Sequence, residues 1–309
     1  IWEDIVYKKM YVTGGIGATG GNEGFAEPYF LPNMSAYCET CASIGNIFTN
    51  HRLFLLHGEC RYADILEKTL YNSMLSGVSL TGNRFFYPNP LESSGQHQRS
   101  EWFGCACCPS NIARFIPAIP GYIYAVTDRD LYVNLYISNE ADIQIGDQKV
   151  KISQSSGFPW DGKVQILVGT GHKAKFIMKL RIPGWARNEA IPGDLYRFEE
   201  QSPVDFSLLL NGDTLITEIN NGYVSIDRIW NDGDKLQLFL PMPVRLITAD
   251  ERIKDDNGKV AVQRGPVIYC AEWPDNNKGN ILNIVLKKDS SFTTQYSADL
   301  LGGTQVIKA

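Results

Sequence analysis

The sequence predicts a mixed α+β protein with more than one domain, in which helices come first and a β-sandwich region follows. Up to about residue 128, apolar residues recur at the three- and four-residue spacing of a helix face. Beyond that point, short β-type runs are separated by turn residues, as in a sandwich. The length of 309 residues also exceeds the usual size of one domain. We therefore expect a helical domain over 1–128 and a β-sandwich region over 129–309, with room for two sub-domains.

The helical part is predicted from apolar spacing and from helix-start residues. In the run 61–78, Ile65, Leu66, Leu70 and Met74 fall on one face. A further run begins at Pro109, because proline is favoured in the first turn of a helix. The expected helices cover 40–56, 61–78 and 109–126; residues 1–7 also read as helix, and 83–88 as an extended segment.

The β region is predicted from short runs of β-branched, aromatic and aliphatic residues. Two Asn-Gly pairs, Asn211-Gly212 and Asn257-Gly258, are hairpin-turn signals, because both residues tolerate a positive φ. The expected strands lie at 131–137, 164–168, 176–182, 206–210, 223–226 and 236–240.

Composition limits the classes of partner. The net charge of −5 gives no reason to expect nucleic acid. The most apolar stretch, 111–126, is interrupted by Arg114, Pro117 and Pro120, so no segment is expected to span a membrane. We expect a small or neutral partner. The chain begins without Met or a targeting signal, which we interpret as a fragment whose compartment the sequence does not indicate.

Two cysteine-bearing segments suggest a metal site. Glu39 and Cys41 lie in one, and Cys107 and Cys108 lie in the other. One carboxylate and three thiolates would suit tetrahedral zinc better than calcium or magnesium. The spacing is not that of a zinc finger, which favours chemistry at the metal. The alternative is that the seven cysteines are buried small hydrophobic residues; their odd number fits no complete disulfide framework.

A glycine-rich segment near the start formally matches a dinucleotide-binding pattern. Residues 15–20 read G-x-G-x-x-G, but that motif must follow a strand and open a helix. Further glycines and Pro28 follow at once. We interpret the run as a loop that delivers Glu23 rather than as a nucleotide site.

Several separate motifs in one order identify a family. They are 12–17 (VTGGIG), Glu23, 31–33 (LPN), 39–45 (ETCASIG), 84–87 (RFFY) and 102–109 (WFGCACCP). The chain resembles glycoside hydrolase family 127, the β-L-arabinofuranosidases, and the related family 146. The resemblance covers the whole chain and places it in the second part of a full-length member. It implies the C-terminal part of an (α/α)6 catalytic barrel over 1–128, followed by β-sandwich domains.

The resemblance also assigns roles to residues. It implies zinc held by Glu39, Cys41, Cys107 and Cys108, with Cys107 as nucleophile and Glu23 as general acid/base. Tyr87 matches an aromatic substrate contact. The implied activity is a retaining hydrolase that removes β-L-arabinofuranosyl or a related sugar from plant-derived glycans. The chain would need the N-terminal remainder of its barrel, or association with another copy, to cover its helix faces.

Each role has a simpler interpretation. Glu23 could be a solvated loop carboxylate, and Glu27 is close enough in sequence to be confused with it. Tyr87 could be a packed aromatic, and Cys38 and Cys105 are expected to pack beside the ligands. Among the histidines, at 51, 57, 97 and 172, His97 is the best candidate to line the substrate site. The alternative function is a non-catalytic carbohydrate-binding or structural protein stapled by a Glu/Cys3 zinc site, because zinc with four protein ligands is usually structural.

Overall fold

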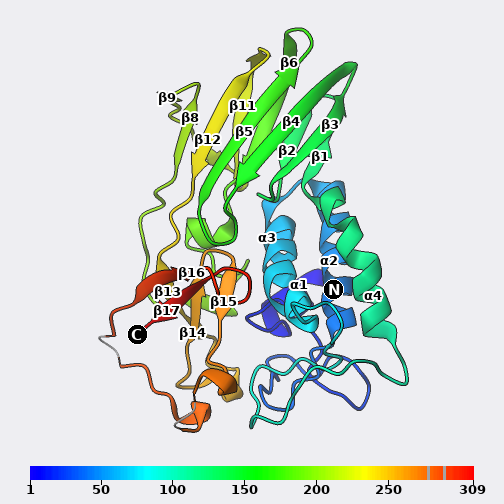
Figure 1. The fold of residues 1–309 in the computed structure, drawn as a ribbon, viewed down its shortest axis with the longest axis vertical. Helices are drawn as coiled ribbons and strands as arrows, with labels where there is room; N and C mark the ends of the chain where they lie inside the picture. Colours follow the sequence, from blue (N-terminus) through cyan, green and yellow to red (C-terminus); the bar gives the residue numbers. More distant parts are fainter. Residues whose placement is uncertain (277–278, 288–289) are drawn as a thin grey trace.

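The computed structural model describes residues 1–276, 279–287 and 290–309, and it has mixed helix and sheet structure. Strands fill the upper part of the molecule in Figure 1, the helices lie below them on one side, and two further sheets lie on the other. The helices are α1 (Trp2–Lys8), α2 (Thr40–His57), α3 (Cys60–Thr69) and α4 (Cys107–Phe115).

The helix predicted over 61–78 forms, but it changes its geometry along its length. α3 continues directly into a π-helix over Leu70–Met74 and a 3-10 turn over Leu75–Gly77. Its apolar face packs with α2 and α4 in one buried cluster. The members of this cluster that lie on α2, α3, the π-helix and α4 are Ile44, Ile47, Leu66, Leu70, Met74, Ile112 and Phe115.

The helix predicted over 109–126 is wrong beyond residue 115. α4 ends at Phe115, and a 3-10 helix follows over Ile116–Tyr122. The strand β1 (Tyr124–Val126) comes next. Pro117 and Pro120 explain the break, because proline removes a backbone donor and clashes with the preceding turn. The predicted extended segment 83–88 contains single β-bridges at Phe85 but no named strand.

Two larger sheets form the upper part of the molecule. The five-stranded sheet has the order β1-β2-β6-β11-β10, with a parallel pairing between β2 and β6. The six-stranded sheet has the order β3-β4-β5-β12-β8-β9. Their strands are β2 (Asp130–Val133), β3 (Asn139–Ile145), β4 (Gln148–Ser156), β5 (Lys163–Thr170), β6 (Ala174–Arg181), β8 (Ser207–Leu210), β9 (Asp213–Thr214), β10 (Ile219–Asn220), β11 (Tyr223–Trp230) and β12 (Asp234–Phe239).

Two smaller sheets complete the structure. A four-stranded sheet has the order β15-β14-β13-β7, and β16 pairs with β17. Their strands are β7 (Tyr196–Phe198), β13 (Val244–Ala249), β14 (Ala261–Arg264), β15 (Val267–Tyr269), β16 (Thr293–Ser297) and β17 (Thr304–Lys308). The strand β7 therefore leaves the larger sheets and pairs with a segment about fifty residues later.

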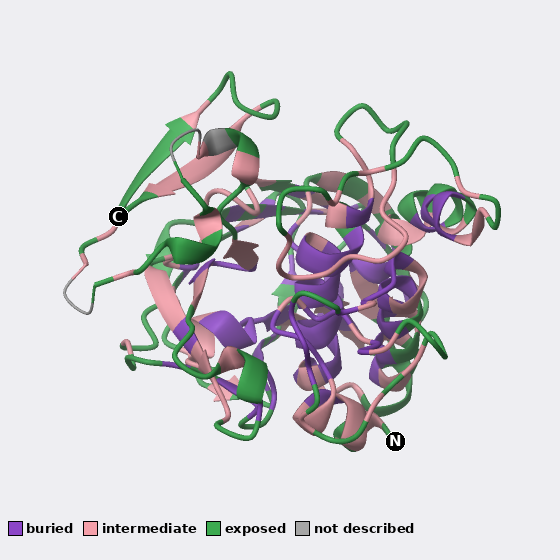
Figure 2. Ribbon diagram, turned by 90° about the horizontal axis from the view of Figure 1, so that it is seen from below, coloured by how far each residue is buried: buried purple, intermediate pink, exposed green. Residues whose placement is uncertain are grey.

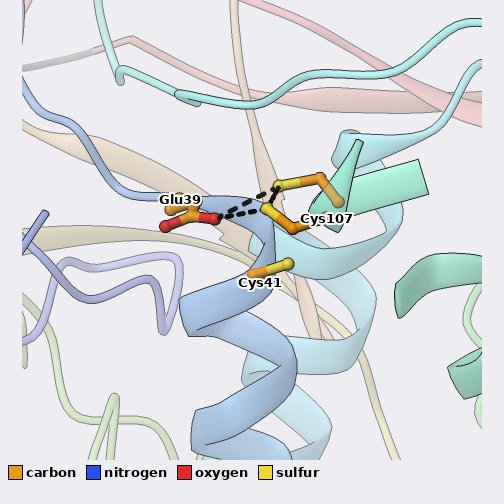
Figure 3. A group of neighbouring side chains, drawn as sticks. Glu39, Cys41 and Cys107 are labelled. Atoms are coloured by element: carbon orange, nitrogen blue, oxygen red, sulfur yellow. Dashed lines mark hydrogen bonds between the residues drawn. The ribbon is translucent and has the colours of Figure 1, made fainter. Parts of the chain in front are cut away.

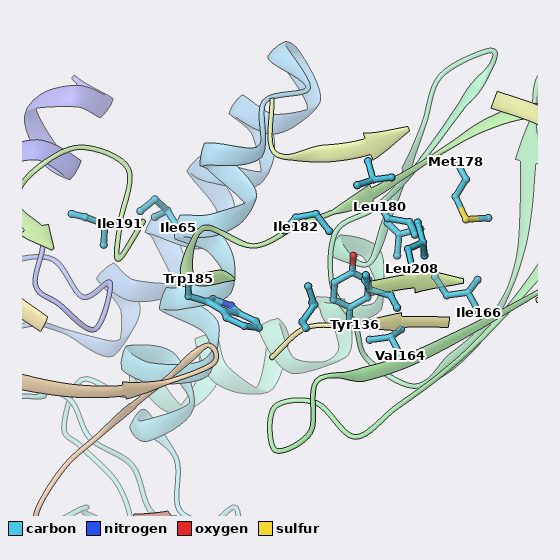
Figure 4. Close-up of a cluster of buried hydrophobic side chains, with 14 of the residues drawn as sticks. Ile65, Tyr136, Val164, Ile166, Met178, Leu180, Ile182, Trp185, Ile191 and Leu208 are labelled. Atoms are coloured by element: carbon cyan, nitrogen blue, oxygen red, sulfur yellow. The ribbon is translucent and has the colours of Figure 1, made fainter. Parts of the chain in front are cut away.

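The two larger sheets share one core because alternate side chains of each face inward. On β5, Val164, Ile166 and Val168 are buried while the residues between them are not. Figure 4 shows this core continuing past Trp185 to Ile65 of α3, so helices and strands belong to one buried cluster. In Figure 2 the buried residues accordingly concentrate in the centre, where helices and sheets meet.

The two Asn-Gly pairs, both predicted to be hairpin turns, form different kinds of turn in the structure. Asn211 and Gly212 have φ values of 55° and 97° and form the two-residue turn between β8 and β9, as predicted. Asn257 and Gly258 lie in the longer connection between β13 and β14, where only the glycine has a positive φ. The second pair is therefore a turn but not a two-residue hairpin.

A buried group of charges joins the helices to the sheets. Arg181, at the end of β6, donates to Asp64 at 2.7 Å and to Glu67, both on α3. Arg187 donates to the other oxygen of Asp64 at 2.8 Å, and the Trp185 indole donates to Glu67 at 3.0 Å. Burial raises the pKa of Glu67 despite its pairing with Arg181.

Within the described residues, no helix combines the length and the apolar character needed to cross a membrane.

Candidate active site and metal centre

The structure brings Glu39, Cys41, Cys107 and Cys108 into one cluster. One ligand atom from each residue lies within 4.8 Å of all the others. The Cys107 thiol lies 3.2 Å from Glu39 Oε1, and the Cys108 thiol lies 3.4 Å from the same oxygen. Figure 3 shows the labelled side chains of Glu39, Cys41 and Cys107 turned toward one another.

Two helix N-termini build the cluster. Glu39 is the residue that precedes α2, Cys41 is the second residue of that helix, and Cys107 and Cys108 open α4. The first backbone N–H groups of a helix lack intrahelical partners and carry partial positive charge. Both helices therefore favour negative charge at this point, which suits a carboxylate and thiolates.

The thiols differ in their tendency to ionise. Interaction with Cys108 lowers the pKa of Cys41 to about 7. Burial raises the pKa of Cys107 to about 11, and interaction with Cys41 raises the pKa of Cys108 well above its usual range. Burial and hydrogen bonding with a neighbouring thiol therefore oppose the release of more than one thiol proton, and a bound cation would favour that release.

The donor set and its spacing fit tetrahedral zinc. Zinc–sulfur bonds of about 2.3 Å in a tetrahedral site place two sulfurs about 3.8 Å apart, and a sulfur and an oxygen about 3.5 Å apart. The Cys107 and Cys108 sulfurs lie 3.7 Å apart. Their distances to Glu39 Oε1, 3.2 and 3.4 Å, are also close to those of a tetrahedron.

Tyr87 and Tyr37 extend from the cluster toward Glu23. A side-chain interaction between the Tyr87 hydroxyl and the Cys107 thiol raises the pKa of Tyr87 above its ordinary range. The ring of Tyr37 lies beside the ring of Tyr87, with the two centroids 6.2 Å apart. The Tyr37 hydroxyl donates to Glu23 Oε1 at 2.9 Å. The predicted site residues Glu23, Tyr87 and Cys107 are thus connected, through a tyrosine that sequence reasoning missed.

Glu23 lies at the tip of a narrow loop. Thr19 and Gly24 exchange two backbone hydrogen bonds of 3.2 Å, and Glu23 between them has a φ of 50°. This loop contains the end of the glycine-rich segment, and no named strand or helix lies between α1 and α2. The segment therefore lacks the strand and helix that a dinucleotide motif requires.

His97 lies beside the segment that carries Tyr87. Its ring stacks on Phe86 with centroids 4.6 Å apart, and its Nε2 lies 3.1 Å from the Pro88 carbonyl oxygen. The predicted role of His97 at the substrate stays a prediction. The loop that holds it contacts the C-terminal part of the chain: the Trp273 indole donates to the Ser93 carbonyl at 3.0 Å.

The remaining histidines and cysteines lie outside the cluster. In the described part of the chain, one group could hold a metal ion, and it contains no histidine. His51 packs on Tyr122 and His57 on Tyr62. Cys38 is buried, and a Cβ on Gly15 would come within 2.2 Å of its sulfur, which explains the glycine there. Cys105 is exposed.

Comparisons with known proteins agree with these motifs. The catalytic domain of the glycoside hydrolase family 127 β-L-arabinofuranosidases matches residues 1–121, the middle domain 130–242 and the C-terminal domain 244–302. The chain belongs to glycoside hydrolase family 127. The resemblance predicted from the motifs is therefore confirmed.

Individual members of family 127 match over nearly the whole chain. A non-reducing end β-L-arabinofuranosidase from Bifidobacterium longum subsp. longum is 36% identical over 99% of this chain and 46% of its own length. The structure of a family 127 β-arabinofuranosidase is 50% identical with a TM-score of 0.96. A Geobacillus stearothermophilus T6 β-L-arabinofuranosidase structure is 38% identical with a TM-score of 0.90. Both alignments cover 99% of this chain and 48% of the solved one. The chain spans about half the length of these relatives.

Proposed function

We propose that this chain carries the catalytic centre of a retaining glycoside hydrolase that removes β-L-arabinofuranosyl groups from plant-derived glycans. The substrate class is that of its relatives, which are named β-L-arabinofuranosidases or β-arabinofuranosidase. The observation that best supports the proposed chemistry is that two neighbouring thiols differ in their exposure to solvent. Cys107 is partly exposed beside Tyr87, whereas Cys108 is completely buried. Of these two neighbouring cysteines, Cys107 can therefore meet a sugar and Cys108 cannot.

In this proposal Glu39, Cys41, Cys107 and Cys108 hold a zinc ion. When bound, zinc favours the thiolate form of its cysteine ligands. The spacing of the sulfurs and of Glu39 Oε1 supports this metal, as does the preference of thiolate-rich sites for zinc over calcium or magnesium.

The proposed reaction has two displacements at the anomeric carbon. In the first, the Cys107 sulfur bonds to that carbon and the glycosidic oxygen leaves with a proton from the Glu23 carboxylic acid. In the second, the Glu23 carboxylate takes a proton from water, the water oxygen bonds to the anomeric carbon, and the Cys107 sulfur leaves as thiolate. Each displacement inverts the carbon, so the net configuration is retained.

Residues 1–128 would form part of an (α/α)6-barrel catalytic domain, and 129–309 the accompanying β-sandwich region. The supporting observation is that the first part of the chain supplies four α-helices within its described residues, too few for a twelve-helix barrel. Exposed Leu55 and Leu56 on α2 favour a covering partner. We propose that an N-terminal remainder provides it in the longer protein, and that Tyr87 and His97 contact the sugar together with that part.

A mechanism-directed labelling experiment tests the cysteine nucleophile. An epoxide or haloacetamide mimic of the arabinofuranoside, incubated with the longer protein, should attach to Cys107, as read by peptide mass mapping. Cys105→Ala is a matched control, because Cys105 is an exposed thiol outside the cluster and its loss should leave the labelling unchanged. NMR of the first released sugar should show the β anomer.

The structural alternative gives the opposite results. If zinc only staples α2 to α4, the mimic should label no cysteine of the cluster, and no sugar should be released. Labelling of Cys108 in place of Cys107 would also contradict the proposed mechanism.

A further inference from the structure

The Glu23 carboxylate lies at the tip of an exposed loop. The loop 19–24 is closed by two backbone hydrogen bonds and by the Thr19 hydroxyl, which donates to Asn22 Oδ1 and to the Gly24 carbonyl oxygen, but no hydrogen bond within the loop reaches the Glu23 carboxylate. A carboxylate on such a loop would sample many orientations, whereas general acid catalysis needs one within hydrogen-bond reach of the leaving oxygen. The structure gives this carboxylate a hydrogen bond from the Tyr37 hydroxyl at 2.9 Å.

Tyr37 is itself held on three sides. Its carbonyl oxygen accepts a hydrogen bond from the Asn89 N–H at 2.9 Å, and its ring lies beside that of Tyr87. The ring also meets the loop, since a Cβ on Gly20 would come within 3.2 Å of the Tyr37 ring. Two residues later the chain reaches Glu39, so Tyr37 connects the loop to the cluster through a short, fixed piece of backbone.

We propose that Tyr37 is a positioning residue that holds the Glu23 carboxylate over the Cys107 side of the site. The inference rests on the function proposed above and adds a residue to it. It also explains why Glu23 and not Glu27 serves as acid/base, a choice that the sequence leaves open. Within the described residues, the Glu27 carboxylate has no hydrogen-bond partner, whereas Glu23 is fixed by Tyr37.

The variant Tyr37→Phe removes the hydroxyl and keeps the ring that packs against Gly20 and Tyr87. Proton donation by Glu23 matters most for a leaving group that departs poorly as an anion. For methyl β-L-arabinofuranoside, kcat/KM should therefore fall roughly 10-fold, less than the roughly 10²–10⁴-fold lost with a general acid itself. For the 4-nitrophenyl arabinofuranoside, which needs little protonation, the fall should stay below about 2-fold. Zinc content should not change.

A double-mutant cycle separates positioning from a structural role. In a Glu23→Ala background, Tyr37→Phe should have no further effect on either substrate, because the group that it positions is gone. Tyr124→Phe is the matched control: Tyr124 is also half-buried, its hydroxyl donates to Asn139 at 3.1 Å, and it lies on β1. The control should leave both rates unchanged. Gly20→Ala, which presses on the Tyr37 ring, should reproduce the leaving-group dependence in weaker form.

Different results overturn different claims. Equal losses on both substrates, or an undiminished loss in the Glu23→Ala background, would make Tyr37 a structural residue and refute the positioning role. A normal Tyr37→Phe enzyme beside a defective Glu23→Ala enzyme would refute the positioning role and leave the proposed function intact. If Glu23→Ala also retains full activity on the methyl substrate, the acid/base assignment itself fails.

Discussion

Replacing Arg181 by Met should strongly destabilise the protein. Arg181 is completely buried and is the shared partner of Asp64 and Glu67. Met fills much of the same volume but supplies no charge and no donor. Breaking a buried ion pair from one side typically costs about 3–5 kcal/mol, because the remaining charge loses its compensation. In the variant, Asp64 still pairs with Arg187, so we expect the loss of unfolding free energy to lie toward the lower end of that range.

Glu67 carries most of that loss. Without Arg181 it keeps the hydrogen bond from the Trp185 indole but has no compensating positive charge among its hydrogen-bond partners. Burial already raises its pKa, and the variant should raise that pKa further. Because the pKa of Glu67 is raised in the folded state, protonated Glu67 favours the folded protein. This stability is lost as the pH rises through the folded-state pKa. The deficit relative to the unmodified protein should therefore be smaller at pH 5 than at pH 8.

Urea unfolding followed by circular dichroism measures the effect. Lys175→Met is the matched control, because Lys175 lies on the same strand and pairs with Asp227 at the surface. Such exposed pairs contribute about 0–1 kcal/mol. The double variant Arg181→Met/Glu67→Met, which removes both partners, should recover much of the loss. A deficit below about 1 kcal/mol in the single variant, or a double variant no more stable than the single one, would refute the reasoning.

Three further predictions concern other parts of the chain. Burial lowers the pKa of Lys68 to about 8, so between pH 8 and 10.5 the unfolded chain binds more protons than the folded one. In urea titrations, the stability of the protein relative to the Lys68→Met variant should therefore rise with pH in this window, by at most about 3.4 kcal/mol. A difference that stays constant with pH would contradict the lowered pKa. Cys41→Ala should lower the zinc content found by elemental analysis, whereas Cys105→Ala should not; full occupancy without Cys41 would exclude the ligand set. Gly212→Ala should cost about 1 kcal/mol of unfolding free energy, because φ there is 97°.

The cluster and the main helices could be predicted from the sequence because their signals are local. Glu39 and Cys41 precede and open α2, and Pro109 marks the first turn of α4 just after Cys107 and Cys108. The preference of zinc for thiolate and carboxylate donors then selects these four residues from the sequence alone. The coarse division into helices and strands followed in the same way from a change of period near residue 128.

The interactions that sequence reasoning missed are long-range or depend on backbone geometry. Nothing near Tyr37 in the sequence indicates that its hydroxyl meets Glu23, because a loop must fold back to bring them together. Arg181 and its acidic partners are 117 and 114 residues apart in sequence. The strands β3 and β4 were also missed, although Ile143, Ile145, Val150 and Ile152 alternate with polar residues. The π-helix after α3 keeps the apolar face intact, so periodicity does not reveal it.

The contact between Trp273 and the loop that holds His97 limits how the sequence of that loop can change. Gly95 has a φ of 92°, and a Cβ there would come within 3.3 Å of the Trp273 ring, so indole and loop fit closely. In the proposed function this loop contacts the sugar, and its shape depends on a segment far along the chain. Substitutions at Trp273 should therefore change the shape of this loop, and natural variants of the loop should be accompanied by changes near residue 273.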